Sequence, residues 1–309
     1  MYLGIEIGGT KLQLGLGTGN GSIEALWRGE VDVSRGGEGI RERIVETVPQ
    51  LLQQAGLAKC HLHGVGVGFG GPVDDAENRV IKSHQISGWD DFPLADWLSD
   101  TLDGLPVILG NDADVAGLAE ALFGAGKGMT PVFYITIGSG IGGGLIIHGE
   151  IYRGVGRGAA EIGHLRVEQD SATEKALTVE SLASGWGMEN TARTLLGNPS
   201  ANIKSQDIAE RARAGDERCQ RVLDVAIDTL AEAIVRIITL LCPRRIVIGG
   251  GVSLMGEELL FRPLRQRVAE TVFKPFADCY DIVPATLGEE VVVHGALALA
   301  KNTFGKQRP

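Results

Sequence analysis

The sequence predicts an α/β protein built from two similar domains. Strands and helical stretches alternate along its first half, as in a sheet covered by helices. A segment of strand, glycine turn and strand occurs twice, around Gly8-Gly9-Thr10-Lys11 and about 130 residues later around Gly138-Ser139-Gly140. The 309 residues also exceed the roughly 250–300 at which a single hydrophobic core stops growing. We therefore expect duplicated halves, each with its own core.

Turns and apolar periodicity define the elements of the first half. In order, we expect a folded strand pair at 3–16, an amphipathic helix at 39–55, a strand at 65–69, a short helix at 94–99, a strand at 107–109 and a helix at 115–123. The last helix should stop at Gly124-Ala125-Gly126, because glycine favours helix ends.

The second half is expected to contain fewer strands and longer helices. In order, we expect a hairpin at 132–147, a polar glycine-rich segment at 149–171, a helix at 179–196, a helix at 219–241, a strand at 246–248 and a helix at 291–300. Apolar residues cover much of the circumference of the 219–241 helix, which predicts that it is mostly buried. Pro243 should end it.

The uncharged stretch 130–149 allows two other interpretations, and we favour the hairpin over both. It approaches the length of a membrane span, but the glycines at 138, 140, 142, 143 and 144 make it a poor helix. It also contains Gly138-x-Gly140-x-x-Gly143, the spacing of a dinucleotide fingerprint. That motif requires a following helix, whereas Leu145-Ile146-Ile147 predicts a strand.

Composition excludes several classes of function. A net charge of −10 argues against general binding to nucleic acid or an anionic membrane, because both need basic surface. Met1 leads directly into a strand pattern without a secretory leader, so we expect a cytoplasmic protein. The four cysteines have no C-x-x-C spacing, and we expect ordinary thiols. The expected partners are small molecules.

Two groups of polar residues could carry chemistry. Asn111-Asp112 follows a strand and precedes a helix, where an acidic residue either caps the helix or serves as a general base. We expect Asp114 to be the cap, which would leave Asp112 for chemistry. Glu161 and His164 lie three residues apart on a glycine-rich loop, and together with Glu180 they could bind several hydroxyls of one monosaccharide.

An ordered set of motifs resembles the ROK family of sugar kinases and repressors over nearly the whole chain. The motifs lie at residues 5–11, 70–74, 110–113, 119–127, 137–144, 152–154, 161–164 and 248–253. The resemblance implies the fold of the actin and hexokinase superfamily, two RNase H-like domains around a central cleft. The implied domains are residues 1–113 with 290–309, and residues 114–289.

The same resemblance implies roles for individual residues. Asp112 would be the catalytic base. The sugar ligands would be Asn111, Glu161, His164, Glu180 and Gly71. The nucleotide would contact Gly8, Gly9, Thr10, Lys11, Gly138, Ser139, Gly140, Gly250 and Gly251. Glu6 would orient magnesium, either directly or through water.

Three positions depart from the family pattern. Glu6 stands where aspartate is usual, and Ser139 stands where threonine is commoner. The usual cysteine-rich zinc segment is replaced by residues 167–180, which contain no cysteine. We therefore expect no structural zinc.

The resemblance implies an ATP- and magnesium-dependent hexose kinase, glucokinase-like, that phosphorylates the 6-hydroxyl of a monosaccharide. The loop Ile86-Ser87-Gly88-Trp89 resembles a family loop near the sugar and favours glucose. Alternatives within the fold are a kinase of N-acetylmannosamine or another hexosamine, a fructokinase, or a polyphosphate-dependent glucokinase. An alternative of another class is a sugar sensor without catalysis. The apolar helix and the family's habit predict a homodimer.

Overall fold

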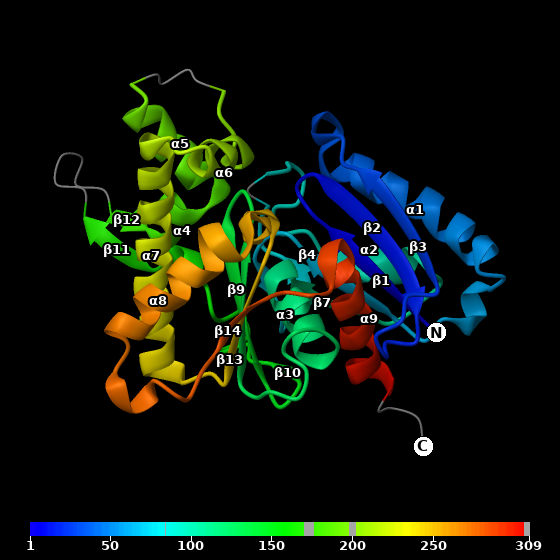
Figure 1. Ribbon diagram of the computed structural model, residues 1–309. Coiled ribbons are helices and arrows are strands. Elements are labelled where there is room, and N and C mark those ends of the chain that lie inside the picture. The colour runs from blue at the N-terminus through cyan, green and yellow to red at the C-terminus, as the bar shows by residue number, and fades with distance from the viewer. Residues whose placement is uncertain (84, 170–175, 198–201, 306–309) are drawn as a thin grey trace. The chain divides into compact units, whose positions relative to one another are not determined.

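The computed structural model describes residues 1–83, 85–169, 176–197 and 202–305. These ranges contain two five-stranded sheets with the same internal arrangement (Figure 1). In each, a hairpin pairs with a third antiparallel strand on one side and two parallel strands on the other. The duplication predicted from the two glycine turns is therefore present in the fold.

The first sheet has the order β3-β2-β1-β4-β7. Its strands are β1 (Tyr2–Ile7), β2 (Lys11–Gly17), β3 (Ala25–Glu30), β4 (Val65–Phe69) and β7 (Val107–Asn111). Ile7 pairs with Phe69 and Phe69 with Asn111, so the three parallel strands end level with one another. A separate small hairpin, β5 (Val73–Asp74) with β6 (Arg79–Val80), follows β4.

The second sheet has the order β10-β9-β8-β13-β14. Its strands are β8 (Val132–Ile137), β9 (Ile141–Ile147), β10 (Glu150–Ile151), β13 (Arg245–Gly249) and β14 (Ile282–Pro284). Because strand β9 directly follows Gly138-Ser139-Gly140, the dinucleotide fingerprint is accidental, as expected. A two-stranded ribbon, β11 (Arg166–Gln169) with β12 (Ala176–Thr178), completes the strands.

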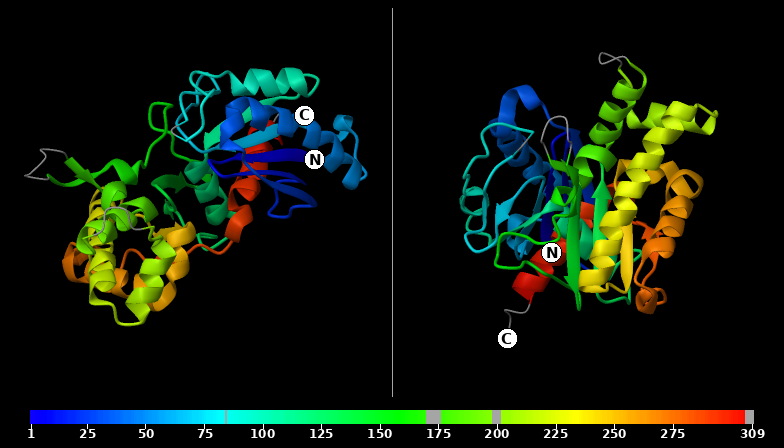
Figure 2. Two further views of the ribbon diagram at one scale, coloured as in Figure 1. Left: turned by 90° about the horizontal axis from the view of Figure 1, so that it is seen from above. Right: turned by 90° about the vertical axis from the view of Figure 1, so that its left-hand side faces the viewer.

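Helices cover both faces of the first sheet (Figure 2). Helices α1 (Gly36–Gln54) and α2 (Leu94–Thr101) pack on one face, where Leu3, Ile5 and Ile7 point into the core. Helices α3 (Asp112–Leu122) and α9 (Val291–Phe304) pack on the other. There α9 approaches very closely, since a Cβ on Gly66 would lie 1.9 Å from the carbonyl oxygen of Ala296.

The helices that follow the second hairpin pack mainly against one another. They are α4 (Val179–Ala183), α5 (Gly185–Leu195), α6 (Ser205–Arg213), α7 (Glu217–Leu241) and α8 (Arg262–Thr271). The sequence predicted one helix over 179–196, whereas Ser184 adopts an extended conformation and separates α4 from α5. Its hydroxyl oxygen accepts a hydrogen bond from the Gly187 amide, which caps α5.

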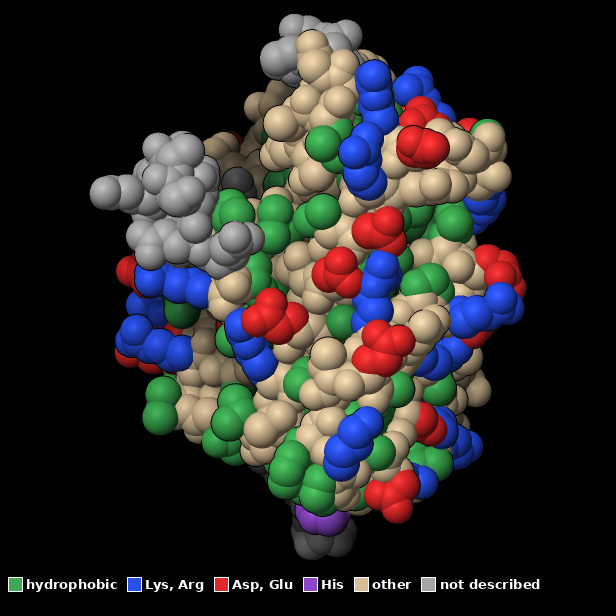
Figure 3. Space-filling model, turned by 60° about the vertical axis from the view of Figure 1, so that its left-hand side comes forward, with side chains coloured by type: hydrophobic (Ala, Val, Ile, Leu, Met, Phe, Trp, Pro, Cys, Tyr) green, Lys and Arg blue, Asp and Glu red, His purple; other side chains and the backbone are tan. Residues whose placement is uncertain are grey.

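Helix α7 is amphipathic, which differs from the mostly buried helix that we expected. Its buried side includes Ile234 and Ile238, but Leu240 is 81% exposed. Elsewhere on α7, Asp224 and Asp228 both pair with Arg267 of α8 at 2.6 Å. Figure 3 shows acidic and basic side chains interspersed over one face of the molecule. Charged residues between the apolar ones leave part of α7 in solvent.

Contacts divide the chain into two compact units, each described here by itself. The first comprises Met1–Gly128, Gly144–Ala159 and Thr286–Pro309, and the second comprises Met129–Gly143 and Ala160–Ala285. The expected domains, 1–113 with 290–309 and 114–289, differ because α3 packs against α9 and so belongs to the first unit. That residues 1–113 with 290–309 and residues 114–289 fold as separate domains stays a prediction. Among the described helices, none is long and apolar enough to cross a membrane.

Candidate active site

The first unit gathers one half of the predicted site at the level ends of β1, β4 and β7. The residues that follow these strand ends are Gly8, Gly70 and Asp112. A Cβ built on Gly70 would lie 3.4 Å from Oδ2 of Asp112 and 3.5 Å from Cα of Gly8. The predicted base and the first glycine turn therefore meet at the carboxyl edge of the sheet, where α/β proteins bind ligands.

Asn111 and Asp112 share the start of α3, and both are half-buried. Asn111 is the cap, since its Oδ1 accepts a hydrogen bond from the Ala113 amide at 2.9 Å. Our expectation that Asp114 caps the helix is wrong, because Asp114 is buried inside the first turn. The Ala113 amide also donates to Oδ1 of Asp112 at 2.8 Å, and Oδ2 lies on the Gly70 side.

Asn111 also connects two predicted sugar ligands. Its Nδ2 donates to the carbonyl oxygen of Gly71 at 3.1 Å. A side-chain amide has two donor hydrogens and two acceptor lone pairs. Asn111 therefore keeps one of each for a ligand after these two bonds.

The first hairpin tip, Gly8 to Thr10, has the geometry of an anion site. The Gly8 amide donates to the carbonyl oxygen of Lys11 at 3.0 Å and closes the tip. Among the described residues, no acceptor pairs with the amides of Gly9 and Thr10. Neighbouring amides at a tight turn can point together at a phosphate oxygen.

Glu6 lies beneath this tip with both carboxylate oxygens engaged. Lys11 Nζ is 3.2 Å from Oε1, and Gln13 Nε2 donates to Oε2 at 2.6 Å. Both side chains also donate to the carbonyl oxygen of Glu289. Burial raises the pKa of Glu6, against the lowering effects of Lys11 and Gln13. The sequence analysis missed Gln13, although the hairpin register places it directly opposite Glu6.

These contacts do not fit Glu6 as a direct magnesium ligand. Mg²⁺ requires near-octahedral oxygen ligands and usually keeps several waters. Glu6 is only 5% exposed, and a metal bond would have to displace the Lys11 ammonium. In the described ranges, no group of three or more His, Cys, Asp or Glu could hold a metal ion. Of the segment expected to lack zinc ligands, residues 170–175 lie outside the described residues.

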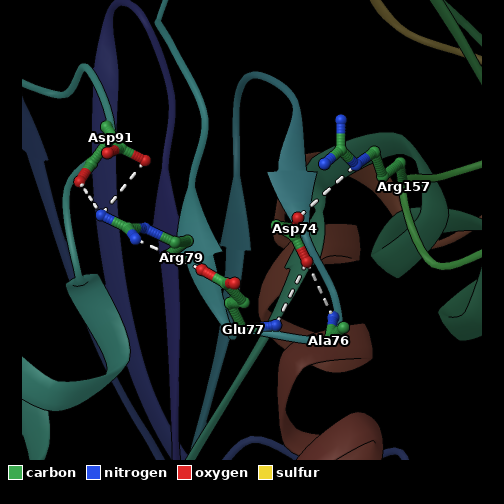
Figure 4. A network of polar contacts seen from close by, with 6 residues as sticks. All are labelled: Asp74, Ala76, Glu77, Arg79, Asp91 and Arg157. Atoms are coloured by element: carbon green, nitrogen blue, oxygen red, sulfur yellow. Dashed lines mark hydrogen bonds and ion pairs between the residues drawn. The ribbon is translucent and has the colours of Figure 1, made fainter.

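Polar contacts of Asp74 hold the turn that follows the motif at residues 70–74. Oδ1 of Asp74 accepts hydrogen bonds from the Ala76 and Glu77 amides, both at 3.1 Å (Figure 4). Its Oδ2 lies 3.6 Å from Nε of Arg157. Asp74 therefore shapes its own turn and ties it to the loop that carries Arg157.

The second unit contains the other half of the predicted site, centred on the tip Gly138-Ser139-Gly140. The Gly138 amide donates to the carbonyl oxygen of Gly140 at 2.9 Å and closes this tip over two residues, whereas the Gly8 amide closes the first tip over three. The start of α5 bonds the opposite side of the tip, since the Gly185 amide donates to the Gly138 carbonyl at 2.8 Å. Within the described ranges, the Ser139 and Gly140 amides have no acceptor.

Glu180 connects this tip to the predicted sugar ligands. Its Oε2 accepts a hydrogen bond from the Ile141 amide at 2.8 Å. Glu161 also lies close enough to His164 and Glu180 for their charges to affect its pKa. Burial, followed by repulsion from Glu180, raises the pKa of Glu161, while His164 lowers it. The second unit thus brings these three side chains together.

Gly250 and Gly251 follow the parallel strand β13 and lie beside the second tip. Gly250 has φ 83°, and a Cβ there would lie 2.5 Å from the carbonyl oxygen of Ile137, the last residue of β8. Only glycine fits this contact. A Cβ on Gly251 would have nothing within 4 Å, so the backbone beside it is open to a ligand.

Trp89, in the loop that resembles the family's sugar loop, is a core residue. It is 1% exposed and packs edge-to-face on Phe69 at 5.3 Å between ring centroids. The Arg41 guanidinium lies over the Trp89 ring, 5.1 Å from the ring centroid. The indole therefore supports the end of β4. The contribution of its loop to a preference for glucose stays a prediction.

Comparisons with known proteins agree with this geometry. A profile of the ROK family matches residues 2–303. A glucokinase of Thermotoga maritima is 31% identical over 98% of each chain, and a glucokinase of Halalkalibacterium halodurans is 32% identical over 97% of this chain and 94% of its own.

Solved structures of ROK proteins have a similar fold. A ROK hexokinase from Thermus thermophilus has a TM-score of 0.84 at 26% identity over 99% of both chains. A ROK family glucokinase from Streptomyces griseus, in complex with glucose and AMPPNP, has a TM-score of 0.78 at 30% identity over 97% of this chain and 99% of its own. The predicted fold class and sugar kinase assignment are confirmed. The chain belongs to the ROK family.

Proposed function

We propose that this protein is an ATP-dependent, glucokinase-like hexose kinase that transfers the γ-phosphoryl group of ATP to the 6-hydroxyl of the sugar. The observation that carries the proposal is Asp112, half-buried at the level strand ends and next to the Gly8 tip. The glucokinases at 31% and 32% identity support the reaction. The Streptomyces griseus complex with glucose and AMPPNP supports the pair of substrates.

Asp112 acts as the general base in this mechanism. The Ala113 amide holds Oδ1 and so fixes the orientation of the carboxylate. Oδ2 accepts the proton of the 6-hydroxyl as the sugar oxygen attacks the γ-phosphorus. In phosphoryl transfer, orienting the nucleophile matters more than the strength of the base.

The remaining sugar hydroxyls bind to Asn111, Glu161, His164 and Glu180, with Gly71 fixed behind Asn111. Carboxylates accept hydrogen bonds from hydroxyls, and the Asn111 amide supplies both a donor and an acceptor. Glu161 performs this role as the ionised carboxylate, which is the form that accepts most strongly.

Backbone amides hold the phosphates. The tips at Gly8 to Thr10 and Gly138 to Gly140 bind phosphate oxygens through their unpaired amides, and Lys11 and the Ser139 hydroxyl add to these contacts. Gly250 and Gly251 lie beside the adenosine. A magnesium ion bound by the phosphates would neutralise charge on the transferring group, without Glu6 as a direct ligand.

A coupled assay over a panel of sugars and donors tests the proposal. The panel contains glucose, fructose, mannose, N-acetylmannosamine and N-acetylglucosamine, each with ATP or polyphosphate. We expect the highest kcat/KM with glucose and ATP. A preference for a hexosamine, fructose or polyphosphate would change the proposed substrate or donor, while the protein would still be a kinase. No turnover with any pair, combined with tight sugar binding by calorimetry, would favour a non-catalytic sensor and refute the proposal.

The variant Asp112→Asn tests the mechanism. Loss of a general base typically lowers kcat by about 10²–10⁴, and the KM of both substrates should change little, since the amide keeps the shape of the side chain. Asp100→Asn, at an exposed position on α2, is the matched control and should keep wild-type activity. Full activity of Asp112→Asn would remove Asp112 from the mechanism.

The expected homodimer stays a proposal, tested separately. Light scattering at several protein concentrations should give a mass near twice the monomer's 32.7 kDa. A constant mass near that of one chain would contradict it.

A further inference from the structure

Two of the four cysteines lie side by side in the second unit, far from each other in sequence. Cys242 forms the C-terminal cap of α7 in a left-handed conformation, with φ 42°, and its amide donates to the Ile238 carbonyl. Cys279 lies in the segment between α8 and β14, and its amide donates to the carbonyl oxygen of Phe276. Both thiols are reduced and half-buried.

Hydrogen bonds hold the two segments in register. Nη1 of Arg244 donates to the Cys279 carbonyl at 3.1 Å. The Arg245 guanidinium binds both carboxylate oxygens of Asp281, at 2.8 and 2.6 Å. The Ile246 amide donates to the Asp281 carbonyl at 2.8 Å, where β13 and β14 begin to pair. Two adjacent guanidinium groups therefore lock the backbone next to each cysteine.

The two thiols lie close enough for the charge of one to affect the other. Burial raises the pKa of Cys279, and charge repulsion and hydrogen bonding from Cys242 and Asp278 raise it further. Asp278 Oδ1 accepts from Cys279 Sγ at 3.7 Å. Thiols on two segments that are hydrogen-bonded this close to each other can reach bonding distance with limited backbone movement. Because Cys279 is mostly protonated at neutral pH, we expect oxidation to be slow and to accelerate as the pH rises.

We propose that Cys242 and Cys279 form a reversible disulfide in the presence of a hydroperoxide. One thiolate attacks the peroxide oxygen, which breaks the O–O bond and gives a sulfenic acid and water. The second thiol then attacks the sulfenic sulfur, the S–S bond forms and another water leaves. In total, two thiols and one hydrogen peroxide give one disulfide and two waters, and a dithiol reverses the reaction.

The bond would connect the last turn of α7 to the segment that leads into β14. Those last turns line an apolar cavity of 530 Å³ together with Glu161 and Ile162, within the same unit. The disulfide would therefore restrain the helix that lies behind the predicted sugar ligand Glu161. This site is independent of the proposed kinase reaction, because neither cysteine belongs to the catalytic set.

Peptide mapping of the whole protein tests the inference. The protein is treated with hydrogen peroxide at pH 8, its remaining thiols are alkylated in denaturant, and it is digested with trypsin without reduction. Trypsin cleaves after Arg236 and Arg244, and after Arg267 and Lys301. We therefore expect a linked pair of peptides 237–244 and 268–301, the loss of two thiols per chain, and full recovery with dithiothreitol.

The other two cysteines supply the controls. Cys60 is exposed and Cys219 is buried, so Cys60→Ser should leave the linked pair unchanged. Cys242→Ser and Cys279→Ser should each abolish it. The proposal is overturned if peroxide consumes Cys60 while Cys242 and Cys279 remain alkylated, or if the dominant link joins two chains. It is also overturned if all four thiols survive. The wild-type map decides these outcomes even if a serine variant folds poorly.

Discussion

Replacing Glu120 by glutamine should destabilise the first unit strongly, although the two side chains have nearly the same shape. Glu120 lies in α3 and is 0% exposed. Its Oε2 accepts from the Ala125 amide at 2.7 Å, and its Oε1 accepts from the Thr286 and Leu287 amides at 2.9 and 2.8 Å. One carboxylate therefore binds the segments where the chain leaves the first unit and returns to it.

The size of the effect follows from counting acceptors. Glutamine keeps one carbonyl oxygen, which can still accept from Thr286 and Leu287, but its NH₂ group would face the Ala125 amide. Losing this bond at a half-buried amide and placing two donors face to face costs about 1–3 kcal/mol, and the other bonds lose their charge assistance. We expect Glu120→Gln to lower the free energy of unfolding by about 2–4 kcal/mol.

Urea unfolding followed by tryptophan fluorescence measures this loss in the right part of the molecule. Three of the four tryptophans, Trp27, Trp89 and Trp97, lie in the first unit. Glu46→Gln on α1, where Glu46 is exposed beside Arg43, is the matched control and should change stability by less than about 0.5 kcal/mol. An equally small change for Glu120→Gln would refute the reasoning.

Two further predictions concern the site itself. Because the pKa of Glu161 is raised above its ordinary value of 4.5, its carboxylate is lost at a higher pH than usual as the solution is acidified. Sugar kcat/KM should therefore begin to fall already above pH 4.5, and Glu161→Gln should remove this acidic limb; a wild-type profile that is flat to pH 4.5 would contradict it. Gly250→Ala should lower the free energy of unfolding by about 2 kcal/mol or more, since its Cβ would lie 2.5 Å from a carbonyl oxygen. Gly251→Ala is the control and should lower it by under about 1 kcal/mol. Equal losses for the two variants in urea unfolding would contradict the contact at Gly250.

The hairpins and most strands could be predicted because their signals are local. Glycines at each tip set the loop length, and a three-residue tip fixes the pairing of the flanking strands. The residue that caps α3 could not be predicted from local sequence. Asn111, Asp112 and Asp114 all have capping side chains within four positions, and only the backbone path out of β7 decides which one reaches a free amide.

Other features depend on partners that are distant in the sequence. Glu120 binds residues 166 and 167 positions away, which no local pattern reveals. The break at Ser184 also has a tertiary cause, because the Gly185 amide binds the Gly138 carbonyl. The site residues proposed from the sequence therefore lie mainly at strand ends and turns, whereas the residues that support them were missed.

The two sheets have similar strand orders, but different residues follow their outer parallel strands. Both tips are closed by the amide of their first glycine and leave two amides for an anion. In the order of the two sheets β4 corresponds to β13, and each is followed by two glycines, Gly70-Gly71 and Gly250-Gly251. The outer strands differ, because β7 leads into Asp112 whereas β14 leads into Ala285. A carboxylate repels phosphate but can accept a hydroxyl proton, while bare glycine backbone permits close approach of a large ligand. This difference fits the proposed function, in which the end of β7 supplies the base and the glycines beside the second tip line the nucleotide site.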